Sequence, residues 1–368
     1  MSPIIPDYAG ANVRGIIPAL LGPSSWANTV PNWMPDAVRV ADAVVLLVLD
    51  GLGWDQLQEH AELAPTMMSM QGRSIHTVAP TTTATALSSI TTGLTPGEHG
   101  LVGYRMALGG EVINVLRWAV GTQQVRRSHP PRDVQTFDPF LGQCVPVVAQ
   151  GELQNSAFSE AHLRGCDPVG WRSPSSIAVE AAAQVEAGER FVYCYYNGVD
   201  KIAHERGFGP FYDAELRFAD SLVAELIDAL PAGTAVLVTA DHGQVDVGDR
   251  LVHPSPELLA PVTMQSGEGR FRWLHCRPGD VAAVADTAAS AHGDVAWVVT
   301  KEQMLDEQWF GPVVSPPIQR RLGDVALCPF EPVSFHEDAD SGPFELVCRH
   351  GSLTSAEVNV PLLGALVD

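Results

Sequence analysis

Lysine is almost absent from this chain of 368 residues, which contains only Lys201 and Lys301. The 43 acidic residues outnumber the 22 basic ones, so the formal net charge is −21. A protein that binds duplex nucleic acid needs a basic face for the phosphates, and this composition argues against that class. A small phosphate-containing substrate would meet the same repulsive field unless bound divalent cations reversed it locally.

Long apolar runs and paired cysteines are also missing. No segment is long and apolar enough to span a membrane, and the first residues lack the basic stretch and unbroken apolar run of a signal peptide. The six cysteines are widely spaced and form no CxxC motif, which favours buried free thiols over disulfides or a zinc knuckle. We therefore expect a cytoplasmic protein that does not associate with membranes.

The recurring pattern of strand, polar turn and helix predicts an α/β fold. Residues 43–49, 191–196 and 235–239 form continuous apolar runs, as expected of strands that are covered on both faces. Residues 211–230 carry apolar side chains at helical spacing. This alternation predicts a central, mostly parallel sheet with helices on both faces.

The stretch of residues 244–348 has a different character. It is rich in proline and glycine, and its predicted strands and helices are short. We expect it to form a small α+β cap that is inserted into the catalytic core, which would then comprise residues 1–243 and 349–368.

Six acidic and histidine residues stand behind predicted strands or in short polar segments: Asp50, Asp200, His204, Asp241, His242 and His350. Ligands of open α/β sheets bind beyond the carboxyl ends of the strands, so these side chains are expected to meet at one edge. Asp200 and His204 are four residues apart, which places them on one face of a helix. Mixed carboxylate and imidazole ligands suit Zn²⁺ or Mn²⁺ better than Ca²⁺.

A threonine at the start of a predicted helix supplies a candidate nucleophile. Residues 84–92 are expected to form this helix, and Thr83 lies where backbone N–H groups and the helix dipole favour a phosphate. Taken alone, TTTAT is more often a solvated loop and DxxxH more often a surface pair, whereas DHG is about as often an ordinary turn. Their occurrence together, in this order, favours phosphate-ester hydrolysis at a two-metal site.

These motifs resemble those of the alkaline phosphatase superfamily, and within it the nucleotide pyrophosphatase/phosphodiesterase branch. The shared elements are DG, PTxT, TGLxPxxHG, DxxxH, DHG and a late HG, found here at residues 50–51, 80–83, 92–100, 200–204, 241–243 and 350–351. The resemblance implies a central sheet sandwiched by helices, with a cap inserted before the last histidine. It also implies one metal held by Asp200, His204 and His350, a second metal held by Asp50, Asp241 and His242, and Thr83 reaching between them as ligand and nucleophile.

One position departs from the family pattern. Many members carry an asparagine in a segment like HGxxxN, which donates to a phosphate oxygen, whereas this chain has Tyr104 there. Tyr104 takes the position of that asparagine, and Arg105 and Lys201 are basic residues close to the motifs, so these three are the candidate substrate contacts. The sequence leaves open what replaces that asparagine.

Longer segments, such as APTTTATALSS and GEHGLVGYR, resemble an intracellular actinobacterial subgroup that includes a cyclic di-AMP phosphodiesterase. We therefore expect hydrolysis of cyclic di-AMP to pApA or AMP through a phospho-threonine ester. The alternatives are a nucleotide pyrophosphatase, a phosphomonoesterase or phosphonate hydrolase on the same site, or a non-catalytic nucleotide-binding or metal-binding protein. The expected partner is a small nucleotide; the choice between zinc and manganese stays open, as does the oligomeric state, for which a homodimer is one alternative.

Overall fold

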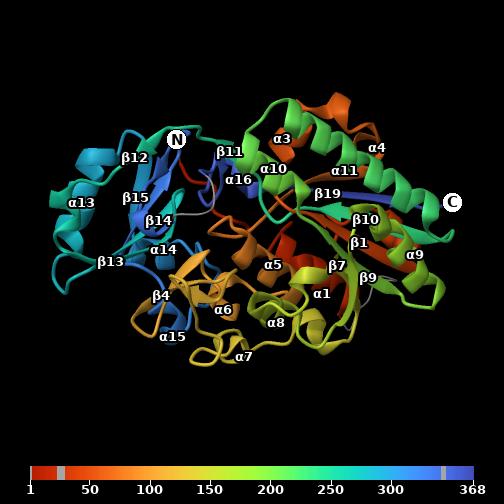
Figure 1. Ribbon diagram of the computed structural model, residues 1–368, viewed down its shortest axis with the longest axis horizontal. Helices are drawn as coiled ribbons and strands as arrows, with labels where there is room; N and C mark the ends of the chain where they lie inside the picture. The colour runs from red at the N-terminus through yellow and green to blue at the C-terminus, as the bar shows by residue number, and fades with distance from the viewer. Residues whose placement is uncertain (1, 23–29, 341–344) are drawn as a thin grey trace.

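The computed structural model describes residues 2–22, 30–340 and 345–368, and a seven-stranded sheet lies at its centre (Figure 1). Strands β10, β1, β9, β7 and β8 are parallel to one another, whereas β19 is antiparallel to both of its neighbours. The strands in sheet order are β2 (Gln71–His76), β19 (Asn359–Leu366), β10 (Thr234–Thr239), β1 (Ala43–Leu49), β9 (Phe191–Tyr196), β7 (Pro146–Gln150) and β8 (Asp167–Trp171).

Helices cover both faces of this sheet. Figure 1 shows α3 (Trp54–Glu59), α10 (Gly198–Arg206) and α11 (Pro210–Ala229) on one side, and α1 (Ile16–Leu21), α5 (Thr83–Thr92) and α8 (Ala157–Leu163) on the other. Because both faces are covered, every residue of the central strand β1 is buried, which explains its unbroken apolar sequence. None of the helices in the described ranges is long and apolar enough to cross a membrane.

The expected α/β class and its main elements are confirmed. Strands β1 and β9 have the predicted bounds, and β10 and α5 each begin one residue earlier than predicted. The cysteines are free as expected, and Cys194, Cys328 and Cys348 are buried. Burial was wrongly expected for Cys144, which is exposed because it lies in the loop before β7 and not within the strand.

A second sheet lies within the expected insertion, beside a core of its own at the far end of the molecule from the C-terminus (Figure 1). Helix α13 (Val281–His292) packs against two of its strands, β15 and β16. Its four antiparallel strands, in sheet order, are β13 (Val262–Glu268), β14 (Phe271–Cys276), β16 (Val325–Pro329) and β15 (Ala296–Thr300). The bounds of the insertion at 244 and 348 stay a prediction.

A small meander adds a third sheet that the sequence analysis did not foresee. Its first strand, β3, contacts β13 of the insertion. The meander consists of β3 (Arg105–Leu108), β4 (Glu111–Asn114), β5 (Ala119–Val120) and β6 (Gln123–Gln124).

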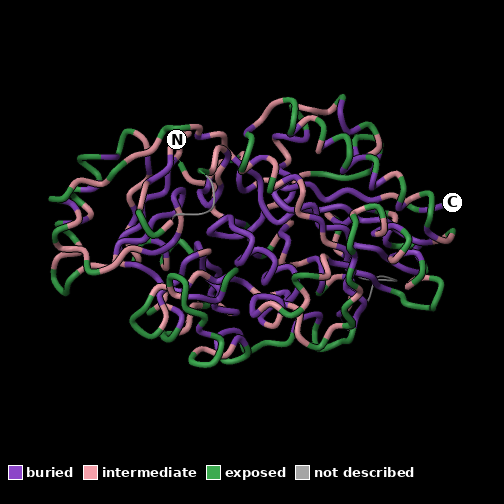
Figure 2. The backbone as a smooth tube through the Cα atoms, viewed as in Figure 1, coloured by how far each residue is buried: buried purple, intermediate pink, exposed green. Residues whose placement is uncertain are grey.

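A buried ion pair joins the insertion to the core. Arg270, in the turn between β13 and β14, donates from Nε and Nη2 to the two carboxylate oxygens of Glu357 over 2.7 and 2.8 Å. Glu357 lies in α16 (Ser355–Val358), directly before β19. Both side chains are fully buried. Figure 2 shows that the buried backbone continues from the central sheet into the insertion, so the two parts share an extended interior.

Candidate active site

The predicted ligands meet at the carboxyl ends of the parallel strands. Asp50 follows β1 directly, Asp241 and His242 follow β10, and Asp200 lies in α10, just after β9. The strand ends approach closely because residue 51 is glycine: at its φ of 76°, a Cβ atom would lie 2.9 Å from Cα of Asp200. A side chain at this position would push the segment of Asp50 away from that of Asp200.

Two overlapping clusters result. One ligand atom from each of Asp50, Asp241 and His242 can be chosen so that all three lie within 4.8 Å of one another, and the same holds for Asp200, His242 and His350. His204 joins the second group, since its Nε2 is 3.2 Å from Oδ1 of Asp200. The structure therefore brings all six predicted metal ligands together.

The three imidazoles are oriented alike by backbone carbonyls. Nδ1 of His204 is 2.6 Å from the carbonyl oxygen of Cys348, and Nδ1 of His350 is 2.8 Å from that of Thr81. Nδ1 of His242 lies 3.1 Å from the carbonyl oxygen of Gly243. A ring that donates from Nδ1 to a carbonyl keeps the Nε2 lone pair free, which is the arrangement found in histidines that bind metals.

Two carboxylate oxygens of the predicted metal ligands are buried and accept no hydrogen bond from the described residues. They are Oδ1 of Asp50 and Oδ2 of Asp241, and they lie 3.6 and 3.4 Å from Nε2 of His242. The other oxygen of Asp241 accepts hydrogen bonds from the backbone N–H groups of Gly51 and His242, each at 3.0 Å. An unpaired buried carboxylate oxygen is costly, so this donor set fits a divalent cation.

The pKa values of these groups show the same need for a cation. Burial, together with Asp241 and Asp200, raises the pKa of Asp50 well above 3.8, and burial also raises that of Asp241. Burial and the neighbouring His242 and His204 lower the pKa of His350 well below 6.5. His350 is thus neutral and ready to act as a ligand, while the crowded carboxylates lack a compensating positive charge.

Thr83 lies at the centre of this arrangement. It is the first residue of α5, and its Oγ1 is 3.1 Å from Nε2 of His242, which belongs to both metal clusters. The first N–H groups of a helix have no partner within it, and although the N–H of Thr85 donates to the carbonyl oxygen of Thr82, those of Thr83 and Ala84 offer donors to an anion next to this hydroxyl. The geometry suits attack by the Thr83 oxygen on a phosphorus atom that is held between the clusters.

A cavity of about 260 Å³ opens beside Asp50, Thr83 and Asp200. Lys201 also lines it, and its ammonium group is 3.5 Å from Oε1 of Gln150. The rest of the wall is largely apolar and includes Leu87, Leu116, Leu153, Phe158 and Leu163. This composition, apolar with a few polar groups, is typical of a site for a small organic ligand.

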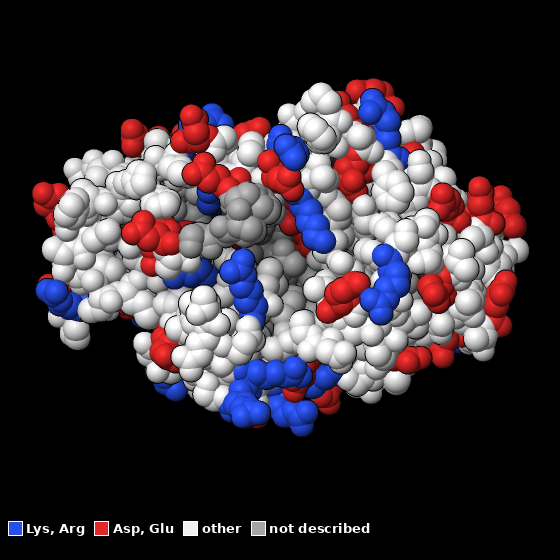
Figure 3. Space-filling view, viewed as in Figure 1, with Lys and Arg blue, Asp and Glu red and all other residues white. Residues whose placement is uncertain are grey.

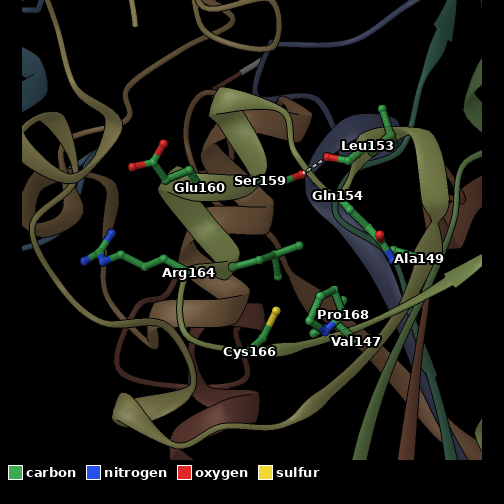
Figure 4. Close-up of a pocket in the computed structure, with 10 residues that line it drawn as sticks. Val147, Ala149, Leu153, Gln154, Ser159, Glu160, Arg164, Cys166 and Pro168 are labelled. Carbon is green, nitrogen blue, oxygen red and sulfur yellow. Dashed lines mark hydrogen bonds between the residues drawn. The ribbon is translucent and has the colours of Figure 1, made fainter. Parts of the chain in front are cut away.

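A second cavity, of about 200 Å³, lies between α8 and strands β7 and β8 (Figure 4). The residues that line both cavities are Ala149, Leu153, Ser159 and Leu163. Figure 4 shows Ser159 bonded to the carbonyl oxygen of Leu153, at a distance of 2.6 Å. None of the described residues that line this second cavity belongs to the two clusters of candidate metal ligands.

The other two predicted substrate contacts lie elsewhere. Neither Tyr104 nor Arg105 lines the cavity beside Thr83. The guanidinium group of Arg105 donates to Glu337 and Asp340 of the insertion, each at 2.5 Å. Arg105 thus ties β3 to the insertion, and contact between these two residues and substrate stays a prediction.

Two residues of the site were missed from the sequence. The hydroxyl of Tyr195 donates to Oδ2 of Asp50, and Oε2 of Glu268 accepts a hydrogen bond from Thr82 over 3.1 Å. Tyr195 could have been suspected, because it is the penultimate residue of β9 and side chains along a strand point alternately to its two faces. Glu268 comes from the insertion, whose placement over the core has no signal in the sequence.

Comparison with known proteins agrees with a site for phosphate-ester hydrolysis. A family described as Type I phosphodiesterase / nucleotide pyrophosphatase matches residues 44–115 and 115–353. The chain belongs to this family. It is therefore a hydrolase of the alkaline phosphatase superfamily that acts on phosphodiester or pyrophosphate bonds, and the two clusters are candidate ligand sets for the two divalent ions that such enzymes use. No curated protein sequence matches the chain.

Solved structures show the same fold at low identity. Murine ectonucleotide pyrophosphatase / phosphodiesterase 5, an inactive variant in complex with AMP, is 15% identical with a TM-score of 0.64, and the match covers 87% of each chain. Phosphonoacetate hydrolase from Sinorhizobium meliloti 1021, in complex with phosphonoformate, is 16% identical with a TM-score of 0.65, covering 88% of this chain and 90% of that one. Both confirm a mostly parallel sheet flanked by helices.

Proposed function

We propose that this protein is a two-metal phosphodiesterase that acts on nucleotides, with cyclic di-AMP as its substrate. The carrying observation is the 3.1 Å contact between Oγ1 of Thr83 and Nε2 of His242, the residue that belongs to both metal clusters. Asp200, His204 and His350 would hold one ion, and Asp50, Asp241 and His242 the other. Bound Zn²⁺ or Mn²⁺ supplies positive charge that lowers the pKa of coordinated oxygens and stabilises the charge on phosphorus-bound oxygens.

The reaction has two displacements at phosphorus. In the first, Oγ1 of Thr83 loses its proton to solvent and forms a bond to phosphorus, the ester bond to the leaving alkoxide breaks, and a proton from solvent completes the alcohol. In the second, water attacks the phospho-threonine ester and releases Thr83 and a phosphate monoester. The N–H groups at the start of α5 donate to the non-bridging phosphate oxygens in both displacements.

The cavity beside Thr83 supports a nucleotide. Its apolar wall suits the faces of a purine base, and Lys201 offers a positive charge near the reacting phosphate. The complex of the murine relative with AMP is consistent with such a ligand. The sequence segments that resemble the actinobacterial subgroup favour cyclic di-AMP among nucleotides.

Chromatography of cyclic di-AMP after incubation with the protein and Mn²⁺ or Zn²⁺ tests the proposal. We expect conversion to pApA or AMP that EDTA abolishes and that the Thr83→Ala variant lacks. If cyclic di-AMP survives while bis(p-nitrophenyl) phosphate is cleaved, the chemistry stands and the substrate is another diester or a nucleotide pyrophosphate. If neither compound is cleaved with either metal, phosphodiester hydrolysis is refuted.

A second candidate is phosphonate hydrolysis on the same site. It is favoured by the likeness to phosphonoacetate hydrolase. The predominantly apolar wall of the cavity, with Lys201 as its one cationic side chain among the described lining residues, suits a base better than a small dianionic phosphonate. Release of inorganic phosphate from phosphonoacetate, assayed beside the diesters, separates the two activities.

A further inference from the structure

A carboxylate from the insertion reaches the residue next to the proposed nucleophile. Glu268 is the last residue of β13 and pairs with Phe271 across the two-residue turn at 269–270. Its Oε2 lies 3.1 Å from Oγ1 of Thr82 and 3.9 Å from Nδ1 of His350. The glycine at position 351 makes room for it, because a Cβ there would lie 3.0 Å from Cγ of Glu268. The side chain is 12% exposed, so this contact is made away from bulk water.

Thr82 is the N-cap residue of α5, yet its side chain does not cap the helix. Its backbone is extended, with φ −139° and ψ 145°, as an N-cap requires, but its hydroxyl accepts no hydrogen bond from the N–H groups of the helix. In most helices an N-cap threonine accepts from the N–H group of the second or third residue. Here those residues are Ala84 and Thr85, at the end of the helix where Thr83 lies. The hydroxyl of Thr82 donates to Glu268 instead.

We propose that Glu268 is a positioning residue that holds the Thr82 hydroxyl away from the start of α5, so that the helix N–H groups remain free to bind the substrate phosphate. This inference rests on the proposed function, since it concerns the same phosphate site. The N–H of Thr85 already donates to the backbone carbonyl oxygen of Thr82 over 3.0 Å. Without Glu268, the Thr82 side chain turns to accept from the N–H of Ala84 and competes with the phosphate oxygens for this donor.

The hairpin that carries Glu268 is held firmly enough for this role. Arg270, two residues further on, forms the buried two-point ion pair with Glu357, and its Nη1 also donates to the carbonyl oxygens of Glu331 and Val333 over 2.9 and 2.8 Å. Glu357 in turn accepts from the backbone N–H of Ser352 over 3.0 Å, beside the His350 segment. The insertion thus presents Glu268 to Thr82 from a fixed point on the core.

Binding of inorganic phosphate to the Mn²⁺-loaded protein, measured by calorimetry, tests this role without requiring turnover. In Glu268→Ala we expect phosphate to bind about fivefold more weakly, the factor that corresponds to one competing capping bond. The KM for bis(p-nitrophenyl) phosphate should rise in parallel, with a smaller change in kcat. Glu268→Gln retains an oxygen that accepts from Thr82, so it should bind phosphate at least as tightly as the unaltered protein.

The decisive comparison uses Thr82→Val, because valine has the shape of threonine but cannot cap. In this background, Glu268→Ala should no longer weaken phosphate binding, so the double variant should match Thr82→Val alone. If Glu268 acted only through its charge, both Glu268→Ala and Glu268→Gln would tighten phosphate binding, which would overturn the proposal. Weakening that persists in the double variant would overturn it as well.

Two measurements protect this test from other causes. Metal content is determined for every variant, because Glu268 lies near His350, and a comparison counts only between variants that hold two equivalents of metal. If Glu268→Ala does not fold, Glu268→Leu replaces it, because leucine also lacks an acceptor and is larger than alanine. It is compared in the otherwise unaltered protein and together with Thr82→Val. A protein that cleaves no diester but shows the expected phosphate affinities would refute the proposed function and leave the role of Glu268 intact.

Discussion

Tyr195 donates a hydrogen bond from its hydroxyl to Oδ2 of Asp50, which leaves Oδ1 of that carboxylate buried and unpaired beside His242. Burial and the nearby Asp50 raise the pKa of Tyr195 well above 10, so the hydroxyl keeps its proton and acts as a donor throughout the physiological range. The phenol therefore fixes the rotation of Asp50 and decides which of its oxygens faces the metal position.

Loss of this donor should weaken metal binding. In Tyr195→Phe we expect the affinity for the ion at the Asp50 position to fall by about 10-fold to 100-fold, as is usual when a partner of a metal ligand is removed. Calorimetric titration of the metal-free protein with Zn²⁺ or Mn²⁺ measures this affinity. The matched control is Tyr196→Phe, because the hydroxyl of Tyr196 donates to Glu215 and not to a residue of the site. Equal affinities in the two variants would show that Asp50 is oriented without Tyr195.

The sequence was sufficient to predict that the candidate ligands lie together, because most of them follow strands. Asp50 and Asp241 come directly after, or one residue after, runs that could only be buried strands, and parallel strands end at a common edge. The spacing of Asp200 and His204 needed only a helix to place both on one face. These inferences depend on local periodicity, which a single sequence carries.

Contacts between distant segments could not be predicted in this way. Arg105 was expected to be a phosphate contact because it is basic and close to a motif, yet the structure pairs it with Glu337 and Asp340, more than 230 residues later. Glu268 could not be foreseen beside Thr82, because that contact depends on how the insertion packs on the core. The direction of a side chain across such an interface is set by tertiary packing, which has no period in the sequence.

Substitution of the nucleophile should separate chemistry from metal binding. In Thr83→Ala we expect hydrolysis of bis(p-nitrophenyl) phosphate to be lost while two equivalents of metal remain bound, because the six carboxylate and imidazole ligands are unchanged. Thr83→Ser keeps the hydroxyl and should retain measurable turnover. The control is Thr91→Ala, near the other end of α5, where the hydroxyl bonds to the carbonyl oxygen of Leu87. Turnover by Thr83→Ala at the control's rate would rule out a phospho-threonine intermediate.

Removal of metal should destabilise the protein more at higher pH. Folding raises the pKa of Asp50 and Asp241 above the usual 3.8. The metal-free folded state thus binds protons more tightly than the unfolded state, and the stability from this pair is lost as pH rises through the raised values. Bound ions replace those protons and remove the penalty. The difference in Tm between metal-loaded and EDTA-treated protein should therefore widen as pH rises from about 5 to about 8.

His350 does not obscure this result. Burial and the neighbouring imidazoles lower its pKa well below 6.5, so with or without metal it stays unprotonated to lower pH than a free histidine and adds little to the difference. Thermal unfolding at several pH values, with and without EDTA, makes the comparison. As a control, Asp50→Asn/Asp241→Asn lacks both titrating carboxyls and should show little dependence of the difference on pH. A difference that narrows with rising pH in the unaltered protein would contradict the assigned shifts.

Finally, the buried pair of Arg270 and Glu357 should be essential to stability. Arg270→Met leaves a fully buried carboxylate without its cation, so we expect the free energy of unfolding in urea to fall by about 3–5 kcal/mol. The matched control is Arg126→Met, because Arg126 is half exposed in its pair with Glu160, and this change should lower stability by less than about 1 kcal/mol. Arg270→Met/Glu357→Leu should recover part of the loss, because no charge is left unpaired. Similar losses of stability in Arg270→Met and Arg126→Met would mean that Arg270 does not hold the insertion, and with it Glu268, against the core.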